Sequence, residues 1–176
     1  MGGLSPTINK LMVHLNVILI LTFFLTSGLY SEFIFDKPTR RVKQVFIHVS
    51  DSDWAHHDDI SVITNWHVEE NGWSDVGYHY FIKKNGEIQK GRDLERTPSS
   101  QKGHNHATIS ICLHGKEKFT KRQFESLRRL CKQIHESYYG RITFHGHKEV
   151  NSKKTCPNFD YVKVLNLDKD GYMKGI

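Results

Sequence analysis

Hydrophobic side chains occur in short runs at several places along the chain. Residues 42–49 alternate between polar and apolar positions and are rich in β-branched side chains, which is typical of a strand. Residues 108–114 form a continuous β-branched run, which favours a buried strand. Residues 141–144 have the same character over a shorter length. These segments predict a sheet built from short strands.

A hairpin is predicted between residues 78 and 91. Two strand-like runs, 78–84 and 87–91, flank the pair Asn85-Gly86. An Asn-Gly pair in this position favours a two-residue turn in which both turn residues have positive φ. Residues 92–106 are polar and rich in Gly, Ser and His, so we expect a loop there.

Two segments have the polar signals that begin and end helices. Asp58 and Asp59 can cap a helix that runs to about Asn71 and ends at Gly72. A second, longer helix is expected from Thr120, as the next paragraph argues. A final short helix is expected after Pro157.

The second helix has the clearest start signal in the chain. Thr120 and Gln123 have the spacing of a capping box, and Phe119 can pack against Phe124 across the first turn. Gly140 marks the expected end. The apolar positions that share one face of this helix are Phe124, Leu127, Cys131, Ile134 and Tyr138.

Strands and helices are intermixed without strict alternation, and no repeat or linker divides the chain. The predicted fold class is therefore α/β in the mixed α+β sense: a single domain with a central mixed β-sheet flanked by helices.

The first 31 residues have a different character. Lys10 is followed by a mostly apolar run over residues 11–29, and its most apolar part is residues 17–25. That length suits the core of a signal peptide and is short for a membrane span of about 20 residues. We expect residues 1–31 to be a signal peptide, with an uncleaved signal anchor as the alternative, and residues 32–176 to form the domain.

Composition excludes several classes of protein. A hydrophobic content of 38% with 25% charged residues argues against a disordered tail and against a multi-span membrane protein. Three Cys are too few for a disulfide scaffold of this length. The formal net charge of +6 favours an anionic partner surface without identifying it.

The 12 His direct attention to metal chemistry. His48 lies near the end of the first predicted strand, and His145, His147 and Cys156 follow the last one. Imidazole and thiolate are good zinc ligands, but no HExxH or CxxC signature is present. On residue types alone, the spacing is weak evidence for a metal site, and the alternative is that His48 is a hydrogen-bonded strand histidine and Cys156 a small buried hydrophobe.

Other candidates have ordinary structural interpretations on their residue types. Tyr78 begins a hairpin strand, where tyrosine commonly packs, and Lys154 belongs to a lysine pair of the kind found on solvated surfaces. Cys112 and Cys131 are compatible with a disulfide and equally with two buried free thiols.

Four segments match one known family in order and spacing. They are VFIHVSDS, NWHVEENGWSDVGYHYFIKKNGEIQKGRD, GHNHATISICLHG and GHKEVNSKKTCPNFD. In these segments the chain resembles the zinc-dependent N-acetylmuramoyl-L-alanine amidases of the phage-lysozyme type, which are related to peptidoglycan recognition proteins. The resemblance covers about residues 42–162 and implies the amidase/peptidoglycan-recognition fold.

The resemblance implies a Zn²⁺ ion bound by His48, His147 and Cys156, with no ligand role for His145. Two neutral imidazoles and one thiolate leave the ion with a net charge of +1 and an open fourth position.

The resemblance also implies two catalytic residues. Tyr78 matches the tyrosine of the GYH motif, and Lys154 matches the lysine two residues before the ligand cysteine. The segment 150–156 is one residue longer than in the phage enzymes, which makes Lys153 the alternative. Lys154 keeps the spacing to the cysteine, so we expect Lys154 to be the catalytic lysine.

The implied reaction is hydrolysis of the amide bond between the lactyl group of N-acetylmuramic acid and L-alanine in peptidoglycan. The implied protein is a secreted or periplasmic monomer that acts on bacterial peptidoglycan or muropeptides, with no nucleic-acid partner and no stable membrane insertion after signal cleavage. One alternative is a non-catalytic peptidoglycan-binding recognition protein, a kind that typically lacks the ligand cysteine. Another is a domain that regulates a protein partner such as a polymerase, against which the export signal argues.

Overall fold

The structure is a computed structural model, and it describes residues 33–175. The predicted signal peptide, residues 1–31, lies outside the described residues. Within residues 33–175, no helix combines the length and the apolar character that crossing a bilayer requires.

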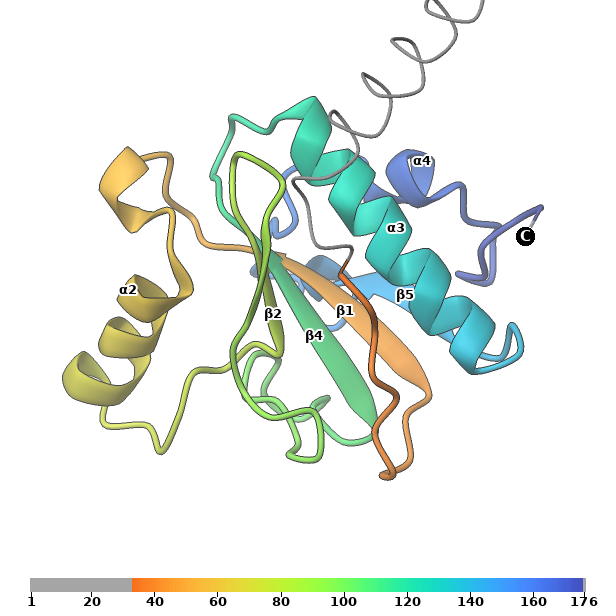
Figure 1. Cartoon of the computed structure of the whole chain (residues 1–176), viewed down its shortest axis with the longest axis horizontal. Coiled ribbons are helices and arrows are strands. Elements are labelled where there is room, and N and C mark those ends of the chain that lie inside the picture. The colour runs from red at the N-terminus through yellow and green to blue at the C-terminus, as the bar shows by residue number, and fades with distance from the viewer. Residues whose placement is uncertain (1–32, 176) are drawn as a thin grey trace, which may run out of the picture. The chain divides into compact units, whose positions relative to one another are not determined.

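A five-stranded mixed sheet forms the centre of the described domain (Figure 1). The strand order is β3-β2-β4-β1-β5, and only the pair β2–β3 is antiparallel. This arrangement confirms the predicted mixed sheet flanked by helices. The strands are β1 (Gln44–Val49), β2 (Tyr80–Ile82), β3 (Ile88–Lys90), β4 (Thr108–Leu113) and β5 (Thr143–Gly146).

The central strands are buried because they are covered on both faces. Every residue of β4 is buried, as its continuous β-branched run predicts. Its partner β1 begins two residues later than predicted, and β5 is shifted two residues toward the C-terminus, so that it ends at Gly146. This shift places His147 immediately beyond a strand end, at the edge of the sheet where β1 also ends.

The hairpin exists, but the predicted two-residue turn is wrong. The N–H of Gly86 donates to the carbonyl of Lys83, and the N–H of Lys83 donates to the carbonyl of Glu87. Gly86 has a φ of 89°, whereas Asn85 is absent from the described non-glycine residues with positive φ. The turn is therefore a longer one with a single left-handed residue. Asn85 instead uses its side-chain oxygen to accept from the N–H of Glu87.

The first predicted helix is present, with an irregular second half. Its N-cap is Asp59, whose carboxylate accepts from the N–H of Ser61. The α-helical part, α2 (Ile60–Asn65), continues directly into a π-helical turn, η2 (Trp66–Glu70). Gly72 follows with a φ of 67°, which confirms the predicted stop.

The long helix α3 (Lys121–Ser137) confirms its sequence signals closely. Thr120 and Gln123 form the capping box, and the rings of Phe119 and Phe124 stack with centroids 6.0 Å apart. Gly140 has a φ of 73° beyond the helix end. The buried positions include Leu127, Leu130, Cys131 and Ile134.

Helices α2 and α3 lie on different sides of β2 and β4 (Figure 1). Ile63 of α2 packs with Phe81 and Cys112, which point to the same face of the sheet. Gln123 of α3 reaches the carbonyl of Ile82, next to Phe81 on β2. The two helices therefore pack on different parts of the sheet: α2 on Phe81 and Cys112, and α3 next to Ile82.

Short elements complete the fold. They are η1 (Ala55–His57), η3 (His147–Glu149) and α4 (Tyr161–Leu165), the last being the short helix expected after Pro157. Cys112 and Cys131 are both buried free thiols, so the question left open by the sequence is settled without a disulfide between them.

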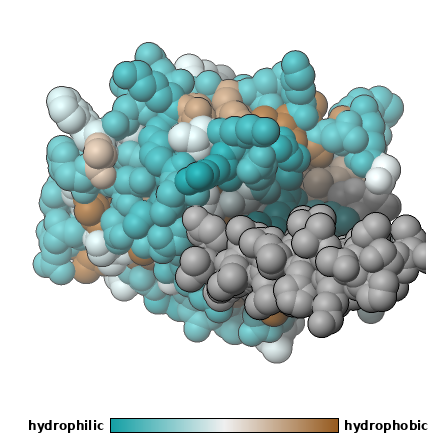
Figure 2. Space-filling model, turned by 45° about the horizontal axis from the view of Figure 1, so that its top comes forward, coloured by the Kyte–Doolittle hydropathy of each residue, from teal (hydrophilic) through white to brown (hydrophobic). Residues whose placement is uncertain are grey.

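The face drawn in Figure 2 is mostly hydrophilic, with separate hydrophobic side chains between the polar ones. Among the described residues, the most exposed large hydrophobic side chains are Tyr139 and Ile34.

Candidate metal centre

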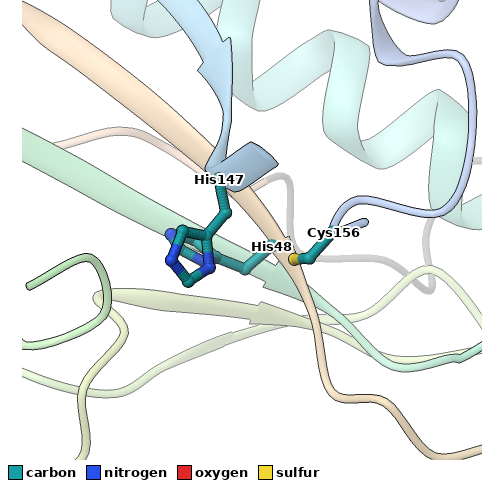
Figure 3. Close-up of side chains that lie close together, drawn as sticks. All are labelled: His48, His147 and Cys156. Carbon is teal, nitrogen blue, oxygen red and sulfur yellow. The ribbon is translucent and has the colours of Figure 1, made fainter. Parts of the chain in front are cut away.

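Three side chains from distant parts of the sequence meet at one edge of the sheet. Figure 3 shows His48 from β1, His147 from η3 and Cys156 from the loop before α4 gathered at one point. Their ligand atoms all lie within 4.8 Å of one another. They are the three residues that the resemblance implied as metal ligands, and the structure brings them together.

His48 is held in its neutral form by its surroundings. It is 1% exposed, and its ring lies 4.8 Å from that of His147, centroid to centroid. Burial and, after it, the charge of His147 lower the pKa of His48 to about 3, while the hydrogen bond with Gln101 acts in the opposite direction. A neutral imidazole keeps a lone pair free, so His48 is ready to bind a metal at neutral pH.

Cys156 is fixed to the strand that carries His48. The N–H of Val49 donates to Sγ of Cys156 at 3.2 Å, and the N–H of Lys148 donates to its carbonyl at 2.8 Å. Burial raises the pKa of the Cys156 thiol to about 11, while the Val49 hydrogen bond and the charge of Lys154 act in the opposite direction. A cation bound here would also lower the pKa of Cys156 and so favour the thiolate.

His147 is placed by close packing around Gly146. A Cβ on Gly146 would lie 2.7 Å from Cδ of Pro157 and 2.9 Å from Cε1 of Tyr161, so only glycine lets the chain of the cysteine loop approach. The carboxylate of Glu149 accepts from the N–H of Gly146 at 2.9 Å and from the hydroxyl of Tyr161. These contacts hold the turn of His147 against the loop of Cys156.

His145 makes its hydrogen bonds away from the three proposed ligands. Its Nδ1 lies 2.7 Å from a carboxylate oxygen of Glu149, and its Nε2 lies 2.8 Å from the hydroxyl of Thr143. Among the described residues, the metal-ligand group is limited to the other three side chains.

Tyr78 borders the group of ligands. Its ring centroid lies 5.3 Å from that of His48, and its ring packs against the cluster that includes Phe81 and Cys112. Burial raises the pKa of Tyr78 well above its ordinary value, and negative charge on Cys112 or Cys156 would raise it further. The phenol is therefore protonated at neutral pH, and it makes a side-chain hydrogen bond with the buried thiol of Cys112.

Lys154 lies within electrostatic reach of two of the three ligands. Its charge lowers the pKa of His147, after burial, and it also lowers the pKa of Cys156. Lys153 and Lys154 both belong to an exposed turn, in which the side-chain and backbone oxygens of Asn151 accept from their respective backbone N–H groups. Of the two lysines, Lys154 is the one whose charge acts on the ligands.

A cavity of about 900 Å³ opens beside the cysteine ligand. Its walls come from the loops that follow β1 and β4 and from the chain around α4. Charged side chains of both signs line it, together with Asn158; the charged ones are Asp51, Lys116, Glu117, Lys148 and Asp160. The three ligands do not line this cavity themselves; Thr155 and Pro157, the chain neighbours of Cys156, do.

One further residue touches the group and carried no sequence signal. Oε1 of Gln101 lies 3.1 Å from Nε2 of His48, and Gln101 is 1% exposed. It belongs to the polar loop 92–106, where a single glutamine has no periodicity or motif to distinguish it.

Comparison with solved structures defines the class of fold. The endolysin N-acetylmuramoyl-L-alanine amidase LysCS from Clostridium intestinale superposes with a TM-score of 0.63 at 26% identity, over 77% of this chain and 90% of that one. Peptidoglycan recognition protein SA of Apis mellifera superposes with a TM-score of 0.61 at 19% identity, over 81% of this chain and 92% of that one, which is a likeness of fold alone. The fold is that of amidases and peptidoglycan recognition proteins.

Sequence comparison then identifies the family. The family model Amidase_2, described as N-acetylmuramoyl-L-alanine amidase, matches residues 38–159. The endolysin of Escherichia phage T7 is 37% identical over 132 residues, which are 70% of this chain and 85% of that protein. The chain belongs to the Amidase_2 family of N-acetylmuramoyl-L-alanine amidases, as its motifs implied.

Proposed function

We propose that this protein is a zinc-dependent hydrolase of the amide bond between the lactyl group of N-acetylmuramic acid and L-alanine. Family membership already identifies the protein as an amidase of peptidoglycan. The observation that supports zinc dependence is that the ligand atoms of His48, His147 and Cys156 lie within 4.8 Å of one another, where β1 and β5 end.

The donor set fits zinc. Two imidazoles and one thiolate are the ligand types that Zn²⁺ prefers, and three protein ligands are the usual number in catalytic sites. Burial keeps His48 neutral, and the Val49 N–H and the Lys154 charge favour the thiolate of Cys156. When bound, zinc supplies Lewis acidity, which polarises a carbonyl and makes water a nucleophile near neutral pH.

Two residues of the chain are suited to stabilise the negative charge that develops on the carbonyl oxygen. Tyr78 keeps its proton because its pKa is raised, so the phenol can donate a hydrogen bond to that oxygen. The charge of Lys154 acts on His147 and Cys156, so it can also act on an oxygen bound between them. Both groups act mainly in the transition state, where the charge is largest.

The cavity beside Cys156 suits the peptide part of the substrate. A stem peptide carries carboxylates and amino groups, and the cavity offers both lysine and acidic side chains. Thr155 and Pro157, the chain neighbours of Cys156, both line the cavity, so it lies next to the cysteine loop. A substrate bound there can place its scissile amide at the ligands.

The proposal includes the setting in which the enzyme works. Peptidoglycan lies outside the cytoplasm, and the apolar run at residues 11–29 supports export by a signal peptide. The excess of Lys and Arg favours approach to anionic wall polymers, and this benefit declines as salt rises. We propose a monomer that takes peptidoglycan or muropeptides as its substrate.

Mass analysis of the soluble products from purified peptidoglycan tests the proposal. The proposed reaction releases stem peptides with a free L-alanine amino terminus and leaves N-acetylmuramic acid with a free lactyl carboxylate. Binding to peptidoglycan without product release would instead favour the recognition protein. Products cut at a glycosidic bond or within the peptide would contradict the proposed bond.

A further inference from the structure

Gln101 and His48 form a buried polar contact beneath the ligand group. Oε1 of Gln101 lies 3.1 Å from Nε2 of His48, and each residue is 1% exposed. The sequence distance between them is 53 residues, so the loop 92–106 is folded back to make the contact. A neutral histidine carries one ring proton, and the atom that carries it decides which nitrogen can bind a metal.

The surroundings of Gln101 determine which way its amide points. Its Nε2 donates to the carbonyl of His104 at 3.3 Å and to the hydroxyl of Thr108 at 3.0 Å. A carbonyl only accepts, and the Thr108 hydroxyl already donates to the carbonyl of Asn105 at 2.8 Å. Both positions therefore need the NH₂ group of Gln101, and its oxygen must face His48.

This orientation fixes the proton on His48. Because Oε1 of Gln101 only accepts, Nε2 of His48 must donate to it, and Nδ1 then keeps the free lone pair. We propose that Gln101 is a positioning residue that holds His48 in the Nε2–H form and so presents Nδ1 as the metal ligand. The inference rests on the proposed zinc site and adds to it a residue that binds no metal itself.

Gln101 is itself held firmly. The side-chain oxygen of Asn105 accepts from the N–H groups of Ser100 and Gln101, at 3.1 and 2.9 Å. The hydroxyl of Ser100 donates to Oε1 of Gln101 and lies 2.7 Å from the hydroxyl of Ser110 on β4. Every polar atom of the Gln101 side chain thus has a partner, which makes it a rigid support.

The chain offers a matched control for removing this amide. Gln123 is also buried, at 0% exposure, and its Nε2 likewise donates to two groups, the carbonyls of Ile82 and His114. It lies on α3 and makes no hydrogen bond to a proposed ligand. Gln101→Met and Gln123→Met therefore remove the same buried group, and only the first removes it from His48.

Zinc affinity, measured by competition with a chromophoric chelator, is the first readout on the full chain. We expect Gln101→Met to weaken zinc binding about 10- to 100-fold, the usual effect of losing a residue that orients a ligand. Gln123→Met should leave it within about 2-fold of the wild type. Equal zinc affinity in Gln101→Met and Gln123→Met would overturn the proposal.

Long-range ¹H–¹⁵N NMR of the zinc-free wild-type chain is the second readout and needs no variant. We expect His48 in the Nε2–H form, and a mixture of both forms in Gln101→Met. A wild-type His48 in the Nδ1–H form would overturn the proposal even if zinc binds. Failure of the wild type to bind zinc would instead count against the zinc site, and the proton position would still decide the role of Gln101.

Discussion

The backbone N–H of Val49 donates a hydrogen bond to Sγ of Cys156 at 3.2 Å, although 107 residues separate them along the chain. Val49 directly follows His48 on β1, so this bond joins the third proposed ligand to the strand of the first. Hydrogen bonds to a sulfur favour its charged form. The backbone of β1 therefore holds the cysteine sulfur beside the strand that carries His48.

Replacing the cysteine should separate metal binding from substrate binding. Cys156→Ser should lose zinc and cleavage together, because a neutral hydroxyl is a much poorer zinc ligand than a thiolate. The cavity walls remain, so the variant should still bind a muropeptide, which calorimetry can measure. Cys131→Ser, at a buried position on α3, is the control and should keep its zinc. Loss of muropeptide binding with an intact circular-dichroism spectrum would show that the metal, not the cavity, holds the substrate.

The two adjacent lysines should differ in their effect on turnover. Lys154→Ala should lower kcat by about 10²–10³-fold, the usual cost of losing one group that stabilises the developing charge. Lys153→Ala should leave kcat nearly unchanged, since the charge that acts on His147 and Cys156 is that of Lys154. Steady-state kinetics on a soluble muropeptide decides the matter, and the reverse order of effects would assign the role to Lys153.

Removing one hydroxyl tests the role of Tyr78. Tyr78→Phe keeps the ring that packs on Phe81 and Cys112, so fold and zinc content should be preserved. Its kcat should fall by about 10²–10³-fold because the donor to the oxyanion is gone. Tyr139→Phe, at an 84% exposed position, should have no effect. Wild-type kcat in Tyr78→Phe would remove the phenol from the mechanism, and loss of zinc would point to a structural role.

Stability should fall in mild acid because of His79. Nδ1 of His79 accepts from the N–H of Ser110 at 3.0 Å, and burial lowers its pKa to about 4. Between the ordinary pKa of about 6.5 and this value, the unfolded chain binds the proton and the folded chain does not, so stability is lost as pH falls through that range. The loss from pH 7 to pH 4 amounts to about 3 kcal/mol for this one group.

Urea unfolding of the wild type and of His79→Asn measures this contribution. The asparagine oxygen can replace Nδ1 as the acceptor for Ser110 and does not titrate. The difference in unfolding free energy between the two proteins should therefore shrink or reverse on going from pH 7 to pH 4. Parallel pH profiles would show that His79 binds its proton equally in both states.

The sequence predicted those parts of the fold that depend on local signals. The capping box of Thr120 and Gln123 and the left-handed Gly140 are set by neighbouring residues, so α3 was placed almost to the residue. The turn at residues 83–87 was not, because an Asn-Gly pair suits more than one hairpin geometry and Asp58 binds the N–H of Lys84 from another element.

In the candidate site, too, local sequence signals could be predicted, and contacts between distant segments could not. The motif order located His48, His147 and Cys156, which the structure brings together. Gln101 was missed because its importance comes only from a contact made across 53 residues. The choice between the two lysines rested on spacing to the cysteine alone, whereas the structure adds the electrostatic reach of Lys154. Contacts between distant segments are the information that a local pattern does not contain.

Zinc titration of metal-free protein, with amide cleavage as the readout, tests the central claim most directly. The wild-type chain, stripped by a chelator and dialysed, should release no stem peptide from purified peptidoglycan. Activity should then rise in proportion to added zinc and level off at about one ion per chain, as one group of three ligands requires. Full cleavage by the metal-free protein, or cleavage that added zinc leaves unchanged, would contradict the account.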